Sequence, residues 1–440
     1  MSDILNGLNP QQKEAVMHTE GPLLILAGAG SGKTRVLTHR IAYLIENGFA
    51  EPEDILALTF TNKAAKEMKE RAASLTGKAA DKMLITTFHS ACVRFLKNRM
   101  MLLGYKRGNF VIYDTDEQKK IIRTIFEETG FQGRYPDIKV YDVISFISKQ
   151  KEKMLGPDEL ESIYPDYPLI TVYKEYERIL KKNNALDFDD LLWKTVQLFE
   201  NYPHILHSYQ EQFKYIMVDE YQDTNLVQFK IISMLADKYQ NLCVVGDDDQ
   251  SIYSFRGADI RNILEFEKEF QNTKVIKLEE NYRSTKNILS AANAVISHNQ
   301  ERKEKKLWTQ GEEGSKLRTI TLPDATTEAK FIVSEIERMH NREKADYKDF
   351  AILYRTNAQS RLFEQCLTMK DIPYRLVGAL SFFERKEVKD MLAYLRVLIN
   401  PDDDFGLERI INVPRRGIGA VTIKKLKEYA FRNNRSLYDA

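Results

Sequence analysis

Cysteine is scarce in this sequence of 440 residues, which contains only Cys92, Cys243 and Cys366 and no C-x-x-C pair. A sparse, odd set argues against a disulfide framework or a zinc site and indicates a reducing compartment. Residues 1–12 lack the basic-then-apolar pattern of a signal peptide. No apolar run approaches the roughly 18–20 residues that a membrane span requires. We therefore expect a soluble cytoplasmic protein with no membrane partner.

The sequence also has little net charge. Its 65 Lys and Arg residues nearly balance its 64 Asp and Glu residues, leaving a formal charge of +1. This balance neither supports nor excludes nucleic acid as a partner, because binding needs a local basic track rather than a basic whole. The length favours about three domains of ordinary size.

The most informative feature that is present is a glycine-rich turn between an apolar run, residues 23–27, and Lys33-Thr34. Glycines let backbone N–H groups surround phosphate oxygens, Lys33 supplies a positive charge, and the Thr34 hydroxyl can hold Mg²⁺. A helix expected to begin near Lys33 adds its positive end. Ala27 replaces the first glycine of the strict pattern, so we interpret the turn as a variant phosphate-binding loop (P-loop) rather than an empty turn. The expected nucleotide-contacting residues are Ala27, Gly28, Ala29, Gly30, Ser31, Gly32, Lys33, Thr34 and Arg35.

A second motif is the apolar run Ile216–Val218, which ends in Asp219 and Glu220. Ligands of open parallel sheets bind at the C-terminal ends of the strands. Neighbouring residues there point in different directions, so Asp219 can face a metal ion while Glu220 faces an attacking water. Such a pair is often only a solvated helix N-terminus, but the upstream phosphate-binding loop favours phosphoryl transfer.

Apolar runs alternate with helical patterns along much of the chain, which predicts a parallel α/β sheet. The expected strands are 23–27, 55–60, 83–87, 215–219, 242–247, 274–278, 318–322 and 350–354. Residues 114–199 show long amphipathic patterns and predict a helical insertion. The polar stretch 301–315 predicts a loop, and the pattern is helical again after residue 384.

Further motifs accompany the two described above. In chain order the set comprises Leu8–Gln12, Ala27–Thr34, Thr59–Ala65, Thr87–Ser90, Asp219–Asn225, Gly246–Ala258, Asn281–Ser284 and Leu353–Arg361. The set resembles, in family order, the Q motif, motifs I, Ia, II, III and IV and the adjoining segments of superfamily 1 helicases of the UvrD/PcrA/Rep type. The resemblance implies an α/β fold of two RecA-like P-loop domains, the second incomplete, with helical insertions. It implies domain 1A at 1–110 and 205–280, insertion 1B at 111–204, the first part of domain 2A at 281–383, and the start of insertion 2B at 384–440.

The resemblance also implies roles in an ATP site. Gln12 would recognise the adenine edge, and Tyr282 would stack on the adenine ring. Gln250 would sense the γ-phosphate, and Arg283 would place a planar cation on it; a surface ion pair is the alternative for Arg283. The implied catalytic residues are Lys33, Glu220, Gln250 and Arg283, and the implied Mg²⁺ ligands are Thr34 and Asp219.

For DNA, the resemblance adds to a physical expectation that aromatic and polar side chains at strand ends hold a single strand by stacking and phosphate contacts. The candidate DNA-binding residues are Phe60, Thr61, Asn62, His89, Tyr253, Phe255 and Arg256. Core packing is the alternative for the aromatic residues, and a structural role for His89. The family usually has Trp at the position of Phe255, so we expect weaker stacking here. Val413–Gly419 resembles a helix-hairpin-helix-like element, with a plain helix cap as the alternative.

The implied function is an ATP-dependent DNA helicase or translocase, moving 3′ to 5′ on single-stranded DNA at duplex junctions in repair or replication. Motifs V and VI of the family are not found, so we expect the N-terminal portion of such an enzyme. The C-terminal remainder and repair or replication proteins are its expected partners. Loss of a transition-state arginine costs about 10³–10⁵ in rate, which predicts poor turnover. The alternatives are a nucleotide-gated DNA-binding remnant, an NTPase switch with a protein partner, and a nuclease fusion beyond residue 440.

Overall fold

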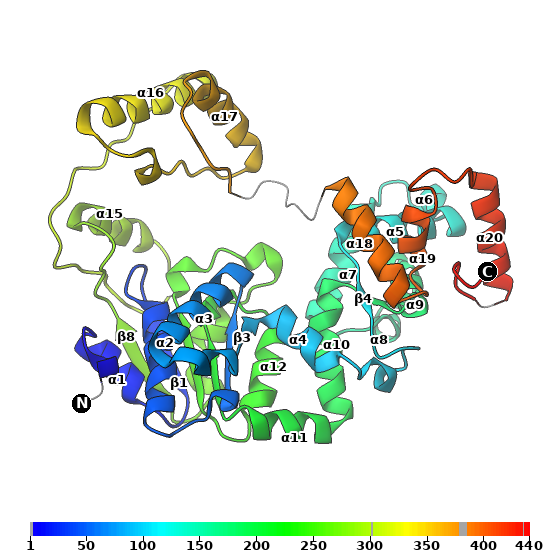
Figure 1. The fold of residues 1–440 in the computed structure, drawn as a ribbon, viewed down its shortest axis with the longest axis horizontal. Helices are drawn as coiled ribbons and strands as arrows, with labels where there is room; N and C mark the ends of the chain where they lie inside the picture. The colour runs from blue at the N-terminus through cyan, green and yellow to red at the C-terminus, as the bar shows by residue number, and fades with distance from the viewer. Residues whose placement is uncertain (1–2, 301, 378–384, 434) are drawn as a thin grey trace. The chain divides into compact units, whose positions relative to one another are not determined.

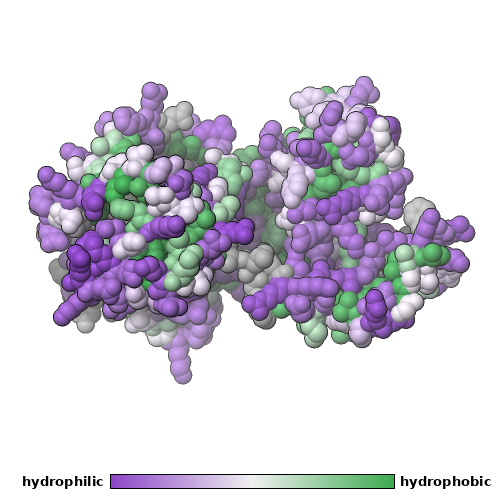
Figure 2. Space-filling view, turned by 90° about the horizontal axis from the view of Figure 1, so that it is seen from above, coloured by the Kyte–Doolittle hydropathy of each residue, from purple (hydrophilic) through white to green (hydrophobic). Residues whose placement is uncertain are grey.

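The computed structural model describes residues 3–300, 302–377, 385–433 and 435–440. The chain forms two compact units, one of residues 1–315, 396–407 and 419–440, the other of residues 316–395 and 408–418. Within the described ranges, no helix combines the length and apolar character needed to cross a bilayer. The face drawn in Figure 2 is largely hydrophilic, with apolar residues in patches between the polar ones.

The larger unit contains a six-stranded parallel sheet with strand order β3-β2-β6-β7-β1-β8. Figure 1 labels β1, β3 and β8 of this sheet. The strands are β1 (Leu23–Ala27), β2 (Ile55–Thr59), β3 (Leu84–Thr87), β6 (Tyr215–Val218), β7 (Leu242–Gly246) and β8 (Lys274–Leu278). Six of the strands predicted from the sequence are thereby confirmed to within one residue at either end. The α/β fold class is confirmed with them.

Both faces of this sheet are buried. Along β1, Leu24 and Leu26 belong to one hydrophobic cluster, while Leu23, Ile25 and Ala27 belong to the other. One face is covered by α1 (Pro10–Met17), α2 (Lys33–Glu46) and α3 (Asn62–Thr76), and the other by α4 (Phe88–Leu96), α10 (Phe188–Asn201) and α12 (Leu226–Ala236). Burial on two faces explains why the inner strands β1, β6 and β7 are continuous apolar runs rather than alternating ones, whereas the edge strand β8 includes the exposed Lys274 and Lys277.

The segment between β3 and β6 is mainly helical. Besides α4 and α10 it contains α5 (Thr115–Thr129), α6 (Phe131–Arg134), α7 (Val140–Glu152), α8 (Pro157–Ile163), α9 (Pro168–Lys182) and α11 (Pro203–Gln212). A small parallel ladder joins β4 (Val111–Ile112) to β5 (Ala185–Leu186). Residues 396–407 pack on this segment: Arg396 pairs with Glu117, and Asp403 accepts a hydrogen bond from Tyr113 at 2.7 Å. The part of this segment from Val111 to Ala185 has, together with Phe405, a core of its own, separate from the two faces of the large sheet, whereas α4, α10 and α11 pack in the core of the sheet.

The larger unit also contains further helices. They are α13 (Arg261–Leu264), α14 (Phe266–Glu269), α15 (Lys286–Ile296) and 3-10 helices at Asp3–Leu5, Pro52–Asp54, Gly77–Asp81, Met100–Leu103, Tyr221–Asp223, Asp248–Gln250 and Ser254–Arg256. Residues 302–315 form no helix or strand, as predicted for most of this polar stretch.

The smaller unit contains α16 (Ala325–Glu343) and α17 (Ser360–Met369), which pack through apolar residues such as Val333 and Leu367. Short 3-10 helices lie at Tyr347–Asp349 and Asn357–Gln359. The strands predicted at 318–322 and 350–354 are wrong: both segments lack regular structure. Strand formation needs a neighbour for its N–H and C=O groups, and no ladder among the described residues reaches either segment.

The helical pattern expected after residue 384 is confirmed by α18 (Lys386–Ile399), α19 (Asp404–Ile410) and α20 (Ala420–Arg432).

Candidate nucleotide-binding site

The C-terminal ends of the six parallel strands meet at one edge of the sheet. The sequence motifs follow these ends one after another. The phosphate-binding loop follows β1, Phe60–Asn62 follows β2, His89 follows β3, Asp219 and Glu220 follow β6, Gln250 follows β7, and Tyr282 and Arg283 follow β8. Parallel topology thus gathers segments that are far apart in the sequence at the edge where such sheets bind ligands.

The phosphate-binding loop has the backbone that its glycines permit. Gly30 and Gly32 have φ angles of 67° and 90°, in the left-handed region that L side chains rarely adopt. A Cβ atom on Gly32 would lie 2.9 Å from the Gln12 side-chain nitrogen, so a larger residue there would also displace the Gln12 amide. The Ser31 hydroxyl donates to the Gly28 carbonyl at 2.7 Å, and α2 begins at Lys33. The loop therefore presents backbone N–H groups at the start of a long helix.

Lys33 points from this loop toward the acidic pair after β6. Its Nζ lies 3.2 Å from Glu220 Oε2, and the Lys33 side chain is 12% exposed. Nζ makes no hydrogen bond of good geometry to any described residue. An ammonium group with unused donors at a P-loop is suited to receive phosphate oxygens.

Asp219 is buried at the end of β6, where its Oδ1 accepts a hydrogen bond from the Glu220 N–H at 3.0 Å. Burial and the neighbouring Glu220 carboxylate raise its pKa to about 6, although Lys33 and a hydrogen bond from Thr34 act in the opposite direction. Thr34 and Asp219 are therefore adjacent. Their oxygen atoms are the ligands that Mg²⁺ prefers.

Glu220 has an unusual backbone conformation, with φ 50° and ψ 44°. A non-glycine residue in the left-handed region costs free energy, and such residues cluster at functional sites. Its carboxylate accepts a hydrogen bond from Gln222 Nε2 at 3.0 Å. The two consecutive carboxylates have different partners: Asp219 accepts a hydrogen bond from the Glu220 N–H, and Glu220 lies beside Lys33.

Gln12 and Tyr282 both contact the phosphate-binding loop, Gln12 at Ser31 and Tyr282 at Gly30. Gln12 is buried, and its Nε2 donates to the Ser31 carbonyl at 2.9 Å, while its Oε1 accepts from Asn9 N–H at 3.1 Å. The ring of Tyr282 is exposed, and its hydroxyl accepts from Asn9 Nδ2 at 2.9 Å and donates to Glu280 at 2.6 Å. The structure thus places both expected adenine-contacting residues beside the loop, with the Gln12 amide bracing it.

Arg283 follows Tyr282 and is also exposed, with its Cβ 2.8 Å from where a Cβ on Gly30 would lie. Asn281 holds this segment in place, because its Nδ2 donates to the Ala29 carbonyl at 2.6 Å and its Oδ1 accepts from the Arg283 N–H at 2.8 Å. Arg35, the remaining expected contact, is exposed in the first turn of α2.

Gln222, for which the sequence alone indicates no role, connects two strand ends. Its Oε1 accepts from the Asp247 N–H at 2.9 Å while its Nε2 donates to Glu220, and its side chain is buried. Asp247 in turn accepts a hydrogen bond from Gln250. Gln222 and Asp247 both lie within sequence motifs described above, and membership in these motifs was the only signal that the sequence offered for them. Their pairing is visible only in the fold.

The aromatic residues after β7 form an exposed cluster. Tyr253 is 39% and Phe255 69% exposed, with ring centroids 5.9 Å apart. The Arg256 guanidinium lies 5.5 Å and 5.6 Å from the two rings. The expected alternative of core packing is wrong for these two aromatic residues, and the cluster offers ring faces beside a cation.

The candidates after β2 and β3 are more strongly tied to the fold. Phe60 is partly buried against the core, and its ring centroid is 5.7 Å from that of Phe88. The Thr61 hydroxyl caps α3, and both Thr61 and Asn62 are exposed. His89 contacts the Phe188 ring edge, and burial lowers its pKa, so the imidazole is neutral at pH 7.

The fold and this site together define a P-loop nucleoside-triphosphate-binding protein. Comparison of the sequence with known families gives two matches, the UvrD/REP helicase N-terminal domain over residues 8–271 and the UvrD-like helicase C-terminal domain over residues 276–437. The chain belongs to the UvrD/REP helicase family, whose two RecA-like domains agree with the α/β architecture. The second match corrects the expectation of an N-terminal portion alone, because the C-terminal domain is represented from residue 276 onward.

Similar proteins extend along the whole chain. The chain is 50% identical over 443 residues to the ATP-dependent DNA helicase PcrA of Staphylococcus epidermidis RP62A, and 50% identical over 442 residues to that of Bacillus subtilis 168. It is 49% identical over 443 residues to the ATP-dependent DNA helicase PcrA of Staphylococcus aureus Mu50. Each alignment covers 100% of this chain but 59–60% of the relative, so the chain spans about 60% of their length.

Proposed function

We propose that this chain binds ATP with Mg²⁺ and hydrolyses it as the motor portion of a DNA helicase or translocase. The observation that carries the proposal is the convergence of Lys33, Asp219 and Glu220 at the edge of the sheet where the phosphate-binding loop begins α2. The names of the relatives, ATP-dependent DNA helicase, support the same activity. Single-stranded DNA next to a duplex, in repair or replication, is the proposed substrate.

The donor set fits a magnesium ion. Asp219 and Thr34 offer a carboxylate and a hydroxyl oxygen side by side, and the raised pKa of buried Asp219 indicates a carboxylate whose charge is incompletely compensated by the protein. A cation there would supply that compensation. When bound, Mg²⁺ neutralises charge on the phosphate oxygens of the nucleotide.

In the proposed hydrolysis Lys33 donates to the terminal phosphates and leaves its contact with Glu220. Glu220, freed from the ammonium, accepts a hydrogen bond from the attacking water and orients it. Gln250 and Arg283 would contact the γ-phosphate from the ends of β7 and β8, and Tyr282 would stack on adenine. Positioning and electrostatic stabilisation together account for catalysis in such sites.

For DNA, we propose that Tyr253 and Phe255 stack on bases and that Arg256 contacts the backbone. Phe60, Thr61, Asn62 and His89 would form the continuation of the track along the same edge of the sheet. Stacking on exposed aromatic rings is sequence-tolerant, which suits a translocase. Movement 3′ to 5′ is part of the proposal and follows from the family resemblance alone.

We propose the same domain division as before, with 1–110 and 205–280 as domain 1A, 111–204 as insertion 1B, 281–383 in domain 2A and 384–440 in insertion 2B. The single sheet formed by β1, β2, β3, β6, β7 and β8 supports joining the first two ranges. The separate apolar core of the intervening helices supports insertion 1B.

The test is ATP hydrolysis by the 440-residue chain with and without single-stranded DNA, with Lys33→Ala as the blank. Turnover that DNA stimulates and Lys33→Ala abolishes would support the motor. Nucleotide-dependent DNA binding without turnover would instead support a nucleotide-gated DNA-binding protein. Displacement of a strand from duplexes with 3′ or 5′ tails then tests polarity, and preference for a 5′ tail would contradict it.

A further inference from the structure

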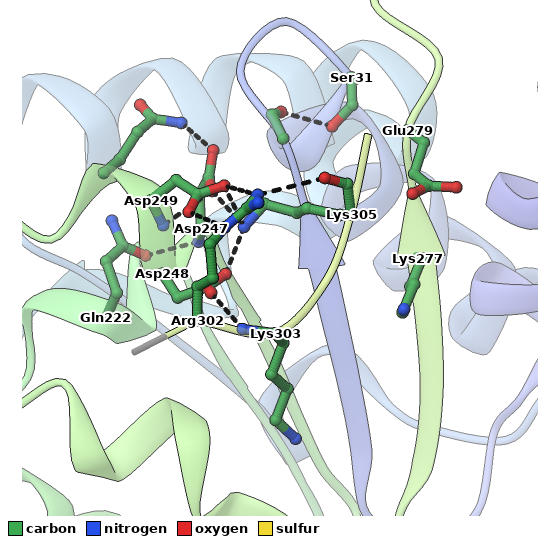
Figure 3. A network of polar contacts seen from close by, with 12 residues as sticks. Ser31, Gln222, Asp247, Asp248, Asp249, Lys277, Glu279, Arg302, Lys303 and Lys305 are labelled. Atoms are coloured by element: carbon green, nitrogen blue, oxygen red, sulfur yellow. Dashed lines mark hydrogen bonds and ion pairs between the residues drawn. The ribbon is translucent and has the colours of Figure 1, made fainter. Parts of the chain in front are cut away.

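Three consecutive carboxylates follow β7, those of Asp247, Asp248 and Asp249, with ligand oxygens within 4.8 Å of one another. Three like charges at this spacing repel one another strongly when they are removed from water. Lys305 supplies the opposite charge. Its Nζ lies 2.9 Å from Asp247 Oδ1 and 2.8 Å from Asp249 Oδ2 and also contacts Asp248 (Figure 3).

This lysine is buried as deeply as the acids it contacts. The Lys305 side chain is 1% exposed, and that of Asp248 is fully buried. Burial opposes the charged form of Lys305, but Asp247 and the hydrogen bonds to all three carboxylates raise its pKa above the ordinary value. The ammonium is therefore charged at neutral pH, in the place that a divalent cation takes in acidic clusters of this kind.

Lys305 belongs to an extended segment, residues 302–308, which we name the strap. Arg302 pairs through two nitrogens with the Asp249 carboxylate at 2.8 Å and 2.7 Å, and the Lys303 N–H donates to Asp248 at 2.8 Å. Main-chain and side-chain donors of the strap thus hold the acidic turn from one side, as Figure 3 shows.

The other end of the strap pairs with the chain that leaves β8. Lys306 N–H donates to Glu279 Oε1 at 2.8 Å, Trp308 N–H donates to the Glu279 carbonyl at 3.0 Å, and Asn281 N–H donates to the Trp308 carbonyl at 2.8 Å. Two residues later the same chain carries Arg283. The strap therefore lies between the acidic turn that contains Gln250 and the segment that contains Arg283.

On the acidic turn, Asp247 connects the lysine to the nucleotide site. One of its oxygens contacts Lys305, and the other accepts the hydrogen bond from Gln250 Nε2. Its backbone N–H donates to Gln222, which donates to Glu220. An unbroken series of contacts runs from the buried lysine to both the Gln250 amide and the Glu220 carboxylate.

We propose that Lys305 is a positioning residue for Gln250, the residue expected to sense the γ-phosphate. The buried Lys305 ammonium fixes the Asp247 carboxylate, which in turn orients the Gln250 amide. The proposal rests on the proposed ATP hydrolysis. The strap lies within the match to the C-terminal helicase domain, and Gln250 lies within the match to the N-terminal domain. The lysine thus fastens the start of one family domain to the sensor of the other.

The first test is steady-state ATP hydrolysis with single-stranded DNA by Lys305→Met, with Lys303→Met as the matched control. Lys303 is two residues away on the strap, but its side chain pairs with Glu267 instead. We expect Lys305→Met to lower kcat at least ~10-fold with the KM for ATP within ~3-fold, because the loss is in transition-state orientation. A kcat within ~2-fold of the wild type would overturn the proposal.

A double-mutant cycle separates positioning from a general structural role. Gln250→Ala already removes the group that Lys305 is proposed to orient, so adding Lys305→Met should lower kcat by less than ~2-fold further. Losses that multiply would show that Lys305 acts independently of Gln250 and would contradict the proposal.

Hydrogen exchange supplies a measurement that does not depend on turnover. The amides of residues 247–251 should exchange faster in Lys305→Met and remain as in the wild type in Lys303→Met. Unchanged exchange would overturn the proposed role of Lys305, even in a chain that hydrolyses no ATP. Absence of Lys33-dependent hydrolysis in the wild type would count against the proposed function only. If Lys305→Met does not fold, Lys305→Met/Asp248→Asn removes one carboxylate together with the cation and replaces it in each assay.

Discussion

Lys33 Nζ lies 3.2 Å from Glu220 Oε2, so the cation of the phosphate-binding loop is paired with the carboxylate proposed to orient water. The pair connects the loop after β1 with the acidic turn after β6, two strands away in the sheet. A phosphate chain that takes over Lys33 would leave the Glu220 carboxylate available to water. In the proposed hydrolysis, this contact would therefore couple nucleotide binding to release of the base.

Replacing Glu220 with Gln should separate binding from hydrolysis. Glu220→Gln removes the proton acceptor and should lower kcat by about 10²–10⁴, the usual contribution of general base catalysis. Nucleotide affinity should be unchanged or higher, because Lys33 no longer has a competing anion. Phosphate release and binding of a fluorescent ATP analogue measure the two effects. Asp237→Asn, at the exposed far end of α12, should change neither.

Magnesium-dependent nucleotide binding should weaken in mild acid. The pKa of Asp219 is raised to about 6 by burial and by Glu220, so below that pH the metal must displace a proton, and affinity should fall about tenfold per pH unit. Titrations of Mg²⁺ at fixed nucleotide between pH 5 and 8 measure this. Asp223, whose pKa is also about 6, provides the control, since Asp223→Asn should retain the pH dependence.

The raised pKa of Asp219 also affects the stability of the fold, which should increase in acid whereas magnesium-dependent binding decreases. Because the folded state binds this proton more tightly than the unfolded state, the contribution of Asp219 to stability is present in acid and is lost as the pH rises through about 6. Asp219→Asn, which cannot ionise, should raise the unfolding midpoint at pH 8 but not at pH 4. An equal effect at both pH values would contradict the assignment.

Phe255 should contribute to the affinity for single-stranded DNA. Its ring is 69% exposed beside Arg256, and stacking on one base is worth about 1–3 kcal/mol, so Phe255→Ala should weaken binding about 5- to 150-fold. Phe255→Trp should strengthen it through a larger ring face. Anisotropy of a labelled oligonucleotide at fixed salt measures both variants. Phe49, another exposed aromatic residue, lies beyond the far end of α2, and Phe49→Ala should bind normally; equal affinity of the two alanine variants would exclude stacking.

Lys151 should be critical for the stability of the helical segment. Its buried Nζ lies 2.7 Å from Glu177, 2.8 Å from Asp187 and 2.8 Å from Asp190. Lys151→Met leaves buried carboxylates uncompensated and should lower the free energy of unfolding by about 3–5 kcal/mol. Urea denaturation measures the change. Lys149→Met, on the exposed side of the same helix, should stay within about 0.5 kcal/mol of the wild type.

Much of the site was predictable because its signals are local. The glycines and Lys33 stand next to one another, and Asp219 directly follows an apolar run. The inner strands β1, β6 and β7 are uninterrupted apolar runs, so the sequence indicates their positions as well as their burial on two faces. Where a strand depended on finding a neighbour, as at 318–322 and 350–354, the same local signal failed.

The amino-acid sequence by itself therefore determined the phosphate-binding loop, the acidic pair and the strands that deliver them, since each depends on residues within a few positions of one another. The tertiary structure alone decided that Gln222 joins Glu220 to Asp247 and that Lys305 neutralises a carboxylate cluster 57 residues before it. A polar stretch between elements carries no periodic pattern, so its ion-pair partners follow only from which strand ends the fold brings together. Charge compensation of buried groups depends on distance in space, which sequence separation does not specify.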